Sequence, residues 1–155
     1  MTTKEDSVRV SILLTTLLAS MTSYAIDNPR ALKMALDDEY KAFATYQQVL
    51  DDFGNVRPFT NIARAEQRHI NALLPFFEKY DLEVPANEYL GQMESYPSVQ
   101  AACQAGVDAE IANVELYDKI YSLTDDEELI AVFENLQAAS QDKHLPAFQR
   151  CARRK

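Results

Sequence analysis

The chain has 155 residues, and its 24 Asp and Glu outnumber its 15 Lys and Arg to give a formal net charge of −9. This length suits one domain of ordinary size that can bury a hydrophobic core. Only three glycines are present, too few for an all-β or loop-rich fold with many tight turns. The acidic charge argues against a nucleic-acid partner, because affinity for a phosphate backbone comes from clustered Lys and Arg.

The first 25 residues have the layout of a secretory signal peptide. Lys4 and Arg9 precede an apolar run from Val10 to Met21, and Ser23-Tyr24-Ala25 provides the small residues of a cleavage site. The run is too short to cross a bilayer core of roughly 30 Å as a helix. We predict cleavage after Ala25, a mature domain over 26–155, and a periplasmic or secreted location. Two alternatives stay open: an amphipathic helix packed on the domain, and membrane association through an uncleaved N-terminus.

Two helices are predicted in the first half of the chain, over residues 28–53 and 58–80. Asp27-Asn28-Pro29 supplies a cap residue and a proline for the first turn, and Gly54-Asn55 ends the first helix. In both segments, core-like positions recur in alternating steps of three and four, the period of a helix. The first stripe contains Leu32, Leu36, Glu39, Phe43, Tyr46, Leu50 and Phe53. The second contains Phe59, Ile62, Glu66, His69, Leu73, Phe76 and Tyr80.

Two further helices are predicted over residues 98–122 and 124–152. Ser98 can cap the first of them, and Thr124-Asp125-Asp126-Glu127 reads as a capping box that begins the second. Their stripes contain Val99, Cys103, Gly106, Glu110, Asn113, Tyr117 and Ile120, and then Ile130, Phe133, Gln137, Ser140, His144, Ala147 and Cys151. Pro75 and Pro146 lie late in the second and fourth helices, so we expect local kinks there.

These elements predict an all-α four-helix bundle of two antiparallel hairpins, 28–80 and 98–152, joined by residues 81–97. The connection can reach roughly 55 Å at about 3.3 Å per residue, which exceeds the length of one helix. If it runs the full length of the bundle, the polar residues of the four stripes all lie roughly 8 to 14 residues from one end. A short connection would place the polar residues of the two hairpins at different heights along the bundle. Their equal distances from one end therefore favour a long crossover.

Both histidines of the chain fall on these core stripes, each late in a hairpin. The first hairpin places Glu39 opposite Glu66-x-x-His69, whose spacing puts both side chains on one helix face. The second hairpin repeats the pattern with Glu110 opposite Gln141-x-x-His144. Buried carboxylates and imidazoles are costly unless something satisfies them. Two hard metal ions would do so, since carboxylates bridge and neutralise them and each imidazole adds a terminal nitrogen.

This arrangement, with the stretch Asn61-Ile62-Ala63-Arg64-Ala65-Glu66-Gln67-Arg68-His69, resembles the ferritin-like di-iron carboxylate superfamily, in an uncharacterised and often exported branch. The resemblance covers roughly residues 30–150. It implies a ferritin-like fold and a centre of one or two iron ions, or another divalent metal. The ligands it implies are Glu39, Glu66, His69, Glu110 and His144, with Gln141 at the place of a second E-x-x-H glutamate. Because an amide brings no charge and bridges poorly, the second metal position stays open.

Other residues have ordinary interpretations beside this one. Tyr46 and Tyr117 follow Glu39 and Glu110 by two turns, so they either donate hydrogen bonds to these carboxylates or only pack in the core. Acids expected on solvated faces and caps are Asp37, Asp38, Asp51, Asp52, Glu78, Glu127 and Glu128, and Glu115 and Glu134 should also be exposed.

Cys103 and Cys151 share one antiparallel register with Glu110 and His144, which places the two sulfur atoms close together. In an oxidising compartment they would form a disulfide, whereas otherwise they would be two buried thiols.

The sequence thus predicts a metal-binding protein, with iron the expected metal, that could act as an iron- or oxygen-linked oxidoreductase. The alternative is a non-catalytic bundle with a degenerate metal site, serving as a binding or assembly module. A homodimer is left open.

Overall fold

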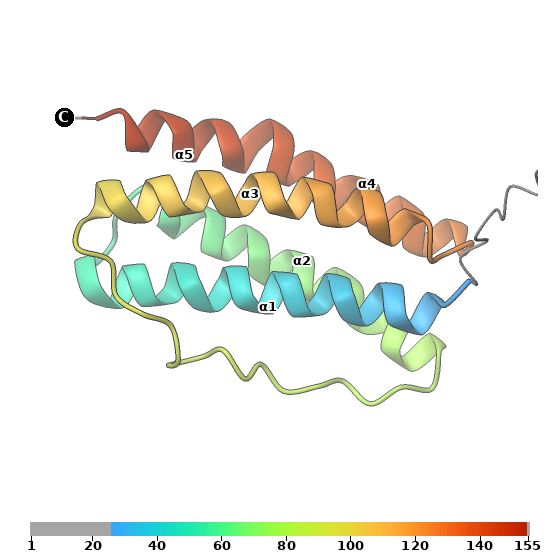
Figure 1. Cartoon of the computed structure of the whole chain (residues 1–155). Helices are drawn as coiled ribbons and strands as arrows, with labels where there is room; N and C mark the ends of the chain where they lie inside the picture. Colours follow the sequence, from blue (N-terminus) through green and yellow to red (C-terminus); the bar gives the residue numbers. More distant parts are fainter. Residues whose placement is uncertain (1–25, 155) are drawn as a thin grey trace, which may run out of the picture.

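The protein is an all-α four-helix bundle, as the sequence predicts (Figure 1). The computed structural model describes residues 26–154, so the predicted signal peptide lies outside the described residues. The first three helices are α1 (Asn28–Phe53), α2 (Phe59–Lys79) and α3 (Val99–Tyr121). The fourth is a composite of α4 (Glu127–Ala139), the π-helical segment η1 (Ser140–His144) and α5 (Leu145–Ala152).

The two hairpins are joined by a crossover that runs the length of the bundle beside α1 (Figure 1). This confirms the long connection over 81–97. Two hydrogen bonds hold it against the helix: Tyr40 Oη donates to the Pro85 carbonyl at 3.1 Å, and Asn87 Nδ2 donates to the Tyr40 carbonyl at 3.1 Å. The crossover returns the chain to the end of the bundle where α2 begins. As a result, α3 runs parallel to α2, and the polar stripe residues of both hairpins lie at the same height along the bundle.

Side-chain caps begin two helices where the sequence predicts them. Asp27 Oδ1 accepts from the Arg30 amide at 3.0 Å at the start of α1, and Ser98 Oγ accepts from the Ala101 amide at 3.1 Å at the start of α3. Each bond satisfies one of the amides that the first helical turn leaves without an intrahelical acceptor.

The predicted capping box at Thr124 is wrong by two residues. The N-cap of α4 is Asp126, whose carboxylate accepts from the amides of Glu128 and Leu129. The Thr124 hydroxyl instead donates to Asn28 Oδ1 at 2.6 Å. Thr124, which the local pattern assigns to the cap, thus makes a tertiary hydrogen bond to the start of α1.

The fourth helix widens just before Pro146. The Leu145 amide bonds to the Ser140 carbonyl, a π-helical step of five residues. A proline inside a helix removes one donor and its ring crowds the carbonyl four residues earlier. A wider turn at η1 accommodates that ring, so the local distortion predicted at Pro146 takes the form of a π turn. The helix α2, by contrast, continues through Pro75.

The apolar core forms two clusters at opposite ends of the bundle. One contains Leu32, Leu36, Leu73, Phe77, Tyr117, Ile120, Leu129 and Phe133 among its buried members. The other contains Tyr46, Val49, Phe59, Ile62, Cys103, Phe148 and Cys151 among its own. Between them lie buried polar residues: Glu39, Glu66, Glu110, Asn113, Ser140 and His144. The core therefore consists of two apolar regions separated by one polar layer.

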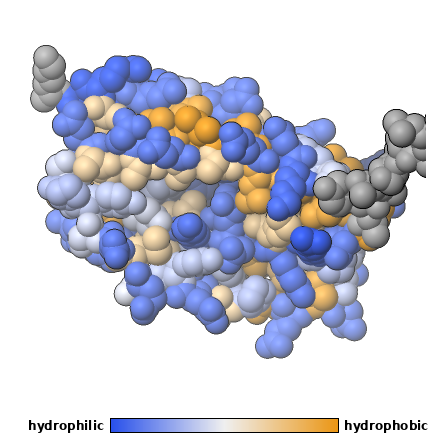
Figure 2. Space-filling view, viewed as in Figure 1, coloured by the Kyte–Doolittle hydropathy of each residue, from blue (hydrophilic) through white to orange (hydrophobic). Residues whose placement is uncertain are grey.

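On the face seen in Figure 2, hydrophilic residues predominate and apolar residues form small groups among them. None of the helices in the described part of the chain is both long and apolar enough to cross a membrane.

The two cysteines lie at disulfide distance, with Sγ atoms of Cys103 and Cys151 1.99 Å apart. Both are buried, and they join α3 to α5 at one end of the bundle. The shared register of the second hairpin is therefore correct, since it places these residues opposite each other.

Removing the disulfide should destabilise the fold. It closes a loop with a sequence separation of 48 residues, so the Cys103→Ala/Cys151→Ala variant should lose about 2–4 kcal/mol of unfolding free energy. Urea unfolding followed by circular dichroism measures this loss. Wild-type protein unfolded in the presence of a reductant should match the double variant. A difference below about 1 kcal/mol in both experiments would contradict the prediction.

Asp126 should stabilise the junction of α2 and α4 in a pH-dependent way. It caps α4 and lies 2.7 Å from Lys79 Nζ, so Asp126→Ala should cost about 1 kcal/mol at neutral pH. Hydrogen bonds from Lys79 and Tyr80 lower the pKa of Asp126 to about 2. Since this lies below its ordinary value, the stabilisation is full above pH 4 and is lost as pH falls toward 2.

The stability difference between wild type and Asp126→Ala should therefore shrink over that pH window, measured by denaturant unfolding at each pH. Asp142→Ala serves as the control, because this exposed acid makes no ion pair with any residue that the structure describes. A difference that stays constant from pH 6 to about 2 would show that only the cap, and not the charge, stabilises the junction.

Candidate metal centre

The first half of the polar layer brings together three of the predicted ligands. Glu39 of α1 and the Glu66–His69 pair of α2 offer ligand atoms that all lie within 4.8 Å of one another. His69 Nδ1 is 2.8 Å from Glu66 Oε2 and 3.2 Å from Glu39 Oε2. The three-residue spacing on α2 directs both of its side chains toward α1, as the sequence pattern predicts.

The second half repeats this arrangement with residues of the other hairpin. Glu66, Glu110 of α3 and His144 of η1 form another group of the same compactness. His144 Nδ1 is 3.1 Å from Glu66 Oε1 and 3.6 Å from Glu110 Oε2. The two imidazole rings stack with centroids 5.5 Å apart. Glu66 belongs to both groups through its two different oxygens, so the halves form one cluster around a shared carboxylate.

Two carboxyl groups of this cluster, those of Glu39 and Glu66, have displaced pKa values. Burial raises the pKa of Glu39 to about 8, and the negative charge of Glu66 adds to this effect. Burial also disfavours an ionised Glu66, but the nearby imidazoles of His144 and His69 outweigh it and lower its pKa to about 2. An ionised carboxylate that lies between two imidazoles offers a negative charge and nearby nitrogen ligands to a metal cation.

The imidazoles shift in the opposite direction to a buried histidine without partners. Burial disfavours their protonated form, yet the adjoining carboxylates raise the pKa of His69 to about 10 and that of His144 to about 9. In the absence of a metal, protons on the two rings therefore compensate the negative charge of the glutamates.

Two buried tyrosines fix the outer carboxylates in a reciprocal pattern. Tyr46 of α1 donates a 2.8 Å hydrogen bond to Glu110 of α3, and Tyr117 of α3 donates a 2.9 Å bond to Glu39 of α1. Of the two interpretations that the sequence leaves open, hydrogen bonding to the carboxylates is the correct one. Each bond ties α1 to α3 across the bundle and orients an oxygen pair toward the cluster.

The residues fit a metal on two further observations. Their donor set consists of carboxylate oxygens and imidazole nitrogens, which bind iron, manganese and zinc. In addition, His144 Nδ1 is buried and makes no hydrogen bond, although a carboxylate oxygen lies 3.1 Å away. The lone pair of this nitrogen is thus available to a metal ion when the ring is not protonated.

Gln141 is the one predicted ligand that the structure does not bring into the cluster. Its side chain is exposed, whereas Ser140 is only 3 % exposed and occupies the inward position. The reason is the π turn, which needs more residues per turn than an α-helix. In η1, residues four apart share the inner face, so Ser140 and not Gln141 lies on the same side as His144.

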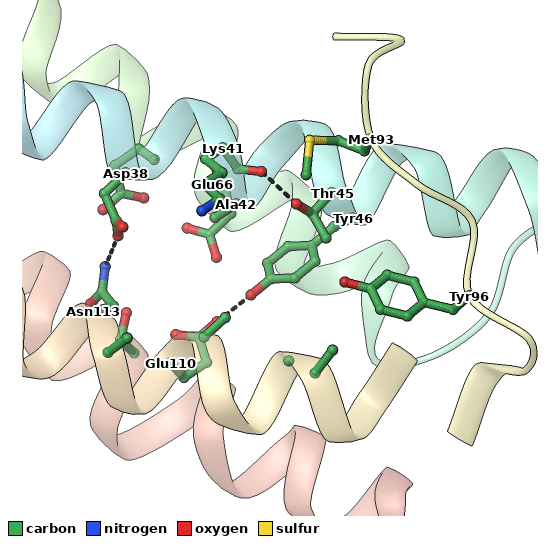
Figure 3. Close-up of a pocket in the computed structure, with 16 residues that line it drawn as sticks. Asp38, Lys41, Ala42, Thr45, Tyr46, Glu66, Met93, Tyr96, Glu110 and Asn113 are labelled. Atoms are coloured by element: carbon green, nitrogen blue, oxygen red, sulfur yellow. Dashed lines mark hydrogen bonds between the residues drawn. The ribbon is translucent and has the colours of Figure 1, made fainter. Parts of the chain in front are cut away.

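A cavity of about 200 Å³ opens onto the carboxylate side of the cluster, between α1 and α3 (Figure 3). Its lining residues include Glu39, Glu66, Glu110 and Ser140 but neither histidine. Met93 and Tyr96 of the crossover also line it (Figure 3). The cavity therefore gives small molecules a path to the glutamates from one side.

Asp38 is a member of this cavity that the sequence pattern misses. It is expected on a solvated face, but it lines the cavity and accepts a 2.6 Å hydrogen bond from Asn113 Nδ2 (Figure 3). Burial raises its pKa. Asn113 Oδ1, on the same amide, is buried and has no hydrogen-bond partner.

For the hydrogen-bonded pair Asp38 and Asn113, the only indication in the sequence is that Asn113 falls on the core stripe. Asp38 carried none, because its position beside Glu39 falls off the stripe. Met93 and Tyr96 likewise could not be found in advance, since the crossover has no helical period.

The fold and this cluster define a class: an all-α four-helix bundle with a buried carboxylate–histidine site suited to metal. The chain belongs to the DUF2202 family, described as an uncharacterized protein domain, whose sequence profile matches residues 28–155. Among solved structures, it is similar to the hypothetical protein MJ0754 from Methanococcus jannaschii DSM 2661. The TM-score is 0.69 and the identity 25 %, covering 79 % of this chain and 78 % of that one. No curated protein matches the chain.

The tyrosine hydrogen bonds should contribute measurably to stability. Tyr117→Phe leaves the buried carboxyl group of Glu39 with one hydrogen-bond partner fewer, so it should cost about 1–3 kcal/mol of unfolding free energy. Tyr121→Phe is a matched control one turn further along α3, because its hydroxyl donates only to the neutral amide of Gln137 in a partly buried place. Denaturant unfolding of both variants measures the difference. Equal losses for the two would refute a special role for the bond to Glu39.

Proposed function

We propose that the protein is a ferritin-like metal-binding protein whose centre holds iron, as one or two ions, or a similar divalent metal. The observation that carries this proposal is the shared use of Glu66 by two compact Glu/His groups, one from each hairpin. Glu39 and His69 would hold one position, Glu110 and His144 the other, and Glu66 would join them. Bound iron would supply one-electron redox chemistry.

The chain's own residues would then do the following. Tyr46 and Tyr117 orient the outer carboxylates, and the two apolar clusters exclude water from both ends of the polar layer. The cavity beside α1 and α3 admits only small molecules to the carboxylate side. These features suit an iron- or oxygen-linked oxidoreductase acting on ferrous iron, dioxygen or peroxide.

A second candidate is a non-catalytic bundle with a degenerate site that serves as a binding or assembly module. The observation that favours it is the lack of a carboxylate on the inner face of η1. Ser140 is buried there, and Gln141, at the place of the second E-x-x-H glutamate, is exposed. In that case the polar groups of the layer would only hydrogen-bond to one another.

We also propose that the protein works outside the cytoplasm, after removal of residues 1–25. The buried pair Cys103 and Cys151 at disulfide distance supports an oxidising compartment.

Metal analysis separates the two candidate functions. Purified protein is loaded anaerobically with ferrous iron and then desalted. It should retain roughly one to two equivalents of iron per chain, measured by mass spectrometry. The Glu66→Ala/His69→Ala variant should retain less than about 0.2 equivalents, because it removes the shared carboxylate and one imidazole.

The matched control is Glu115→Ala, which deletes an exposed glutamate of α3 and should bind as wild type does. Circular dichroism confirms that each variant is folded. Wild-type retention below about 0.2 equivalents of any transition metal, unchanged in the double variant, would favour the non-catalytic bundle.

A further inference from the structure

The cluster has only one carboxylate that both of its halves share. Glu66 of α2 takes part in both groups, but no residue of the fourth helix matches it. The corresponding inward position in η1 holds Ser140, whose hydroxyl is neutral and whose side chain is short. The two hairpins are therefore symmetric in their outer glutamates and histidines and asymmetric in their shared ligand.

This asymmetry leaves the charge of a filled centre unbalanced. Two divalent ions would bring four positive charges, whereas Glu39, Glu66 and Glu110 bring three negative ones and neutral imidazoles bring none. One unit of positive charge would remain in a buried site, which is costly without a counter-charge. Asp38 lines the same cavity, but its carboxylate belongs to neither ligand group and is hydrogen-bonded to Asn113.

The space beside Ser140 can hold the missing counter-charge. The cavity of about 200 Å³ is lined by Ser140 together with Glu66 and Glu110, and a water molecule takes roughly 30 Å³ of liquid volume. A ligand of a few heavy atoms therefore fits, with room for some water.

We propose that the metal-loaded protein binds a small exogenous monoanion in this cavity, beside Ser140, in place of the carboxylate that the fourth helix does not supply. The ligand class is an anion of two to four heavy atoms with an oxygen or nitrogen donor. This inference rests on the proposed metal binding. On this proposal, Ser140 and the π turn leave room at the metal centre for an external ligand.

The test uses cobalt(II) as the metal and azide as the anion probe. Protein loaded with cobalt(II) should show visible absorption bands that report on its ligands. Azide titration of the wild type should change these bands saturably, with half-saturation in the millimolar range or below, roughly. Metal content is measured on the same samples before azide is added.

Two variants place a new carboxylate on the same helix, one inside and one outside. Ser140→Glu puts it in the cavity and should weaken azide binding about tenfold or more while keeping the bound metal, because the counter-charge is now internal. Gln141→Glu adds the same charge one residue further along, on the exposed side. It should leave the azide affinity within about threefold of wild type.

The outcomes are distinguishable. A wild type that retains neither cobalt nor ferrous iron would overturn the proposed function itself. A wild type that retains cobalt but shows no spectral response up to about 100 mM azide would overturn this inference and leave metal binding standing. Equal azide affinities in Ser140→Glu and wild type would also overturn it. If Ser140→Glu does not fold, Ser140→Asp carries the same charge on a shorter side chain and replaces it.

Discussion

The structure depends on one constraint, the burial of carboxylates and imidazoles in a layer between two apolar clusters. Each glutamate alone would destabilise the core by an amount that few domains of this size can absorb. Here the charges satisfy one another: Glu66 lies between two imidazoles, and each outer carboxylate accepts a tyrosine hydroxyl from the opposite hairpin. The layer therefore fixes the register of all four helices, since a shift of one turn would leave every one of these groups unpaired.

The rest of the fold serves to keep this layer in register. The crossover returns the chain along α1, so that the second hairpin presents Glu110 and His144 at the level of Glu39 and His69. The Cys103–Cys151 link joins α3 to α5 in the same register. Close packing contributes too, because a Cβ added to Gly106 would lie 2.8 Å from the ring of Phe148. The glycine thus allows α3 and α5 to approach next to the polar layer.

The fourth helix shows how a local backbone change alters the chemistry of the centre. Pro146 favours a wider turn before it. In that turn Ser140 keeps the inward place that its stripe predicts, whereas Gln141 turns to the exposed side. The layer then receives a hydroxyl in place of an amide, and a cavity borders the shared carboxylate.

The sequence by itself determined the helices and the five residues that meet in the polar layer, because the helical period is local and both histidines fall on it. The predicted stripe at the start of the fourth helix is off by one residue, since Leu129 and Leu136 are buried there and Ile130 and Gln137 are only half-buried. The sequence also determined the disulfide register, since that follows from helix spacing alone. Only the tertiary structure decided the cap at Asp126, the exposed place of Gln141 and the partial burial of Asp38. Each of these depends on a competing contact from a distant segment or on a non-α turn, and neither leaves a periodic trace in the sequence.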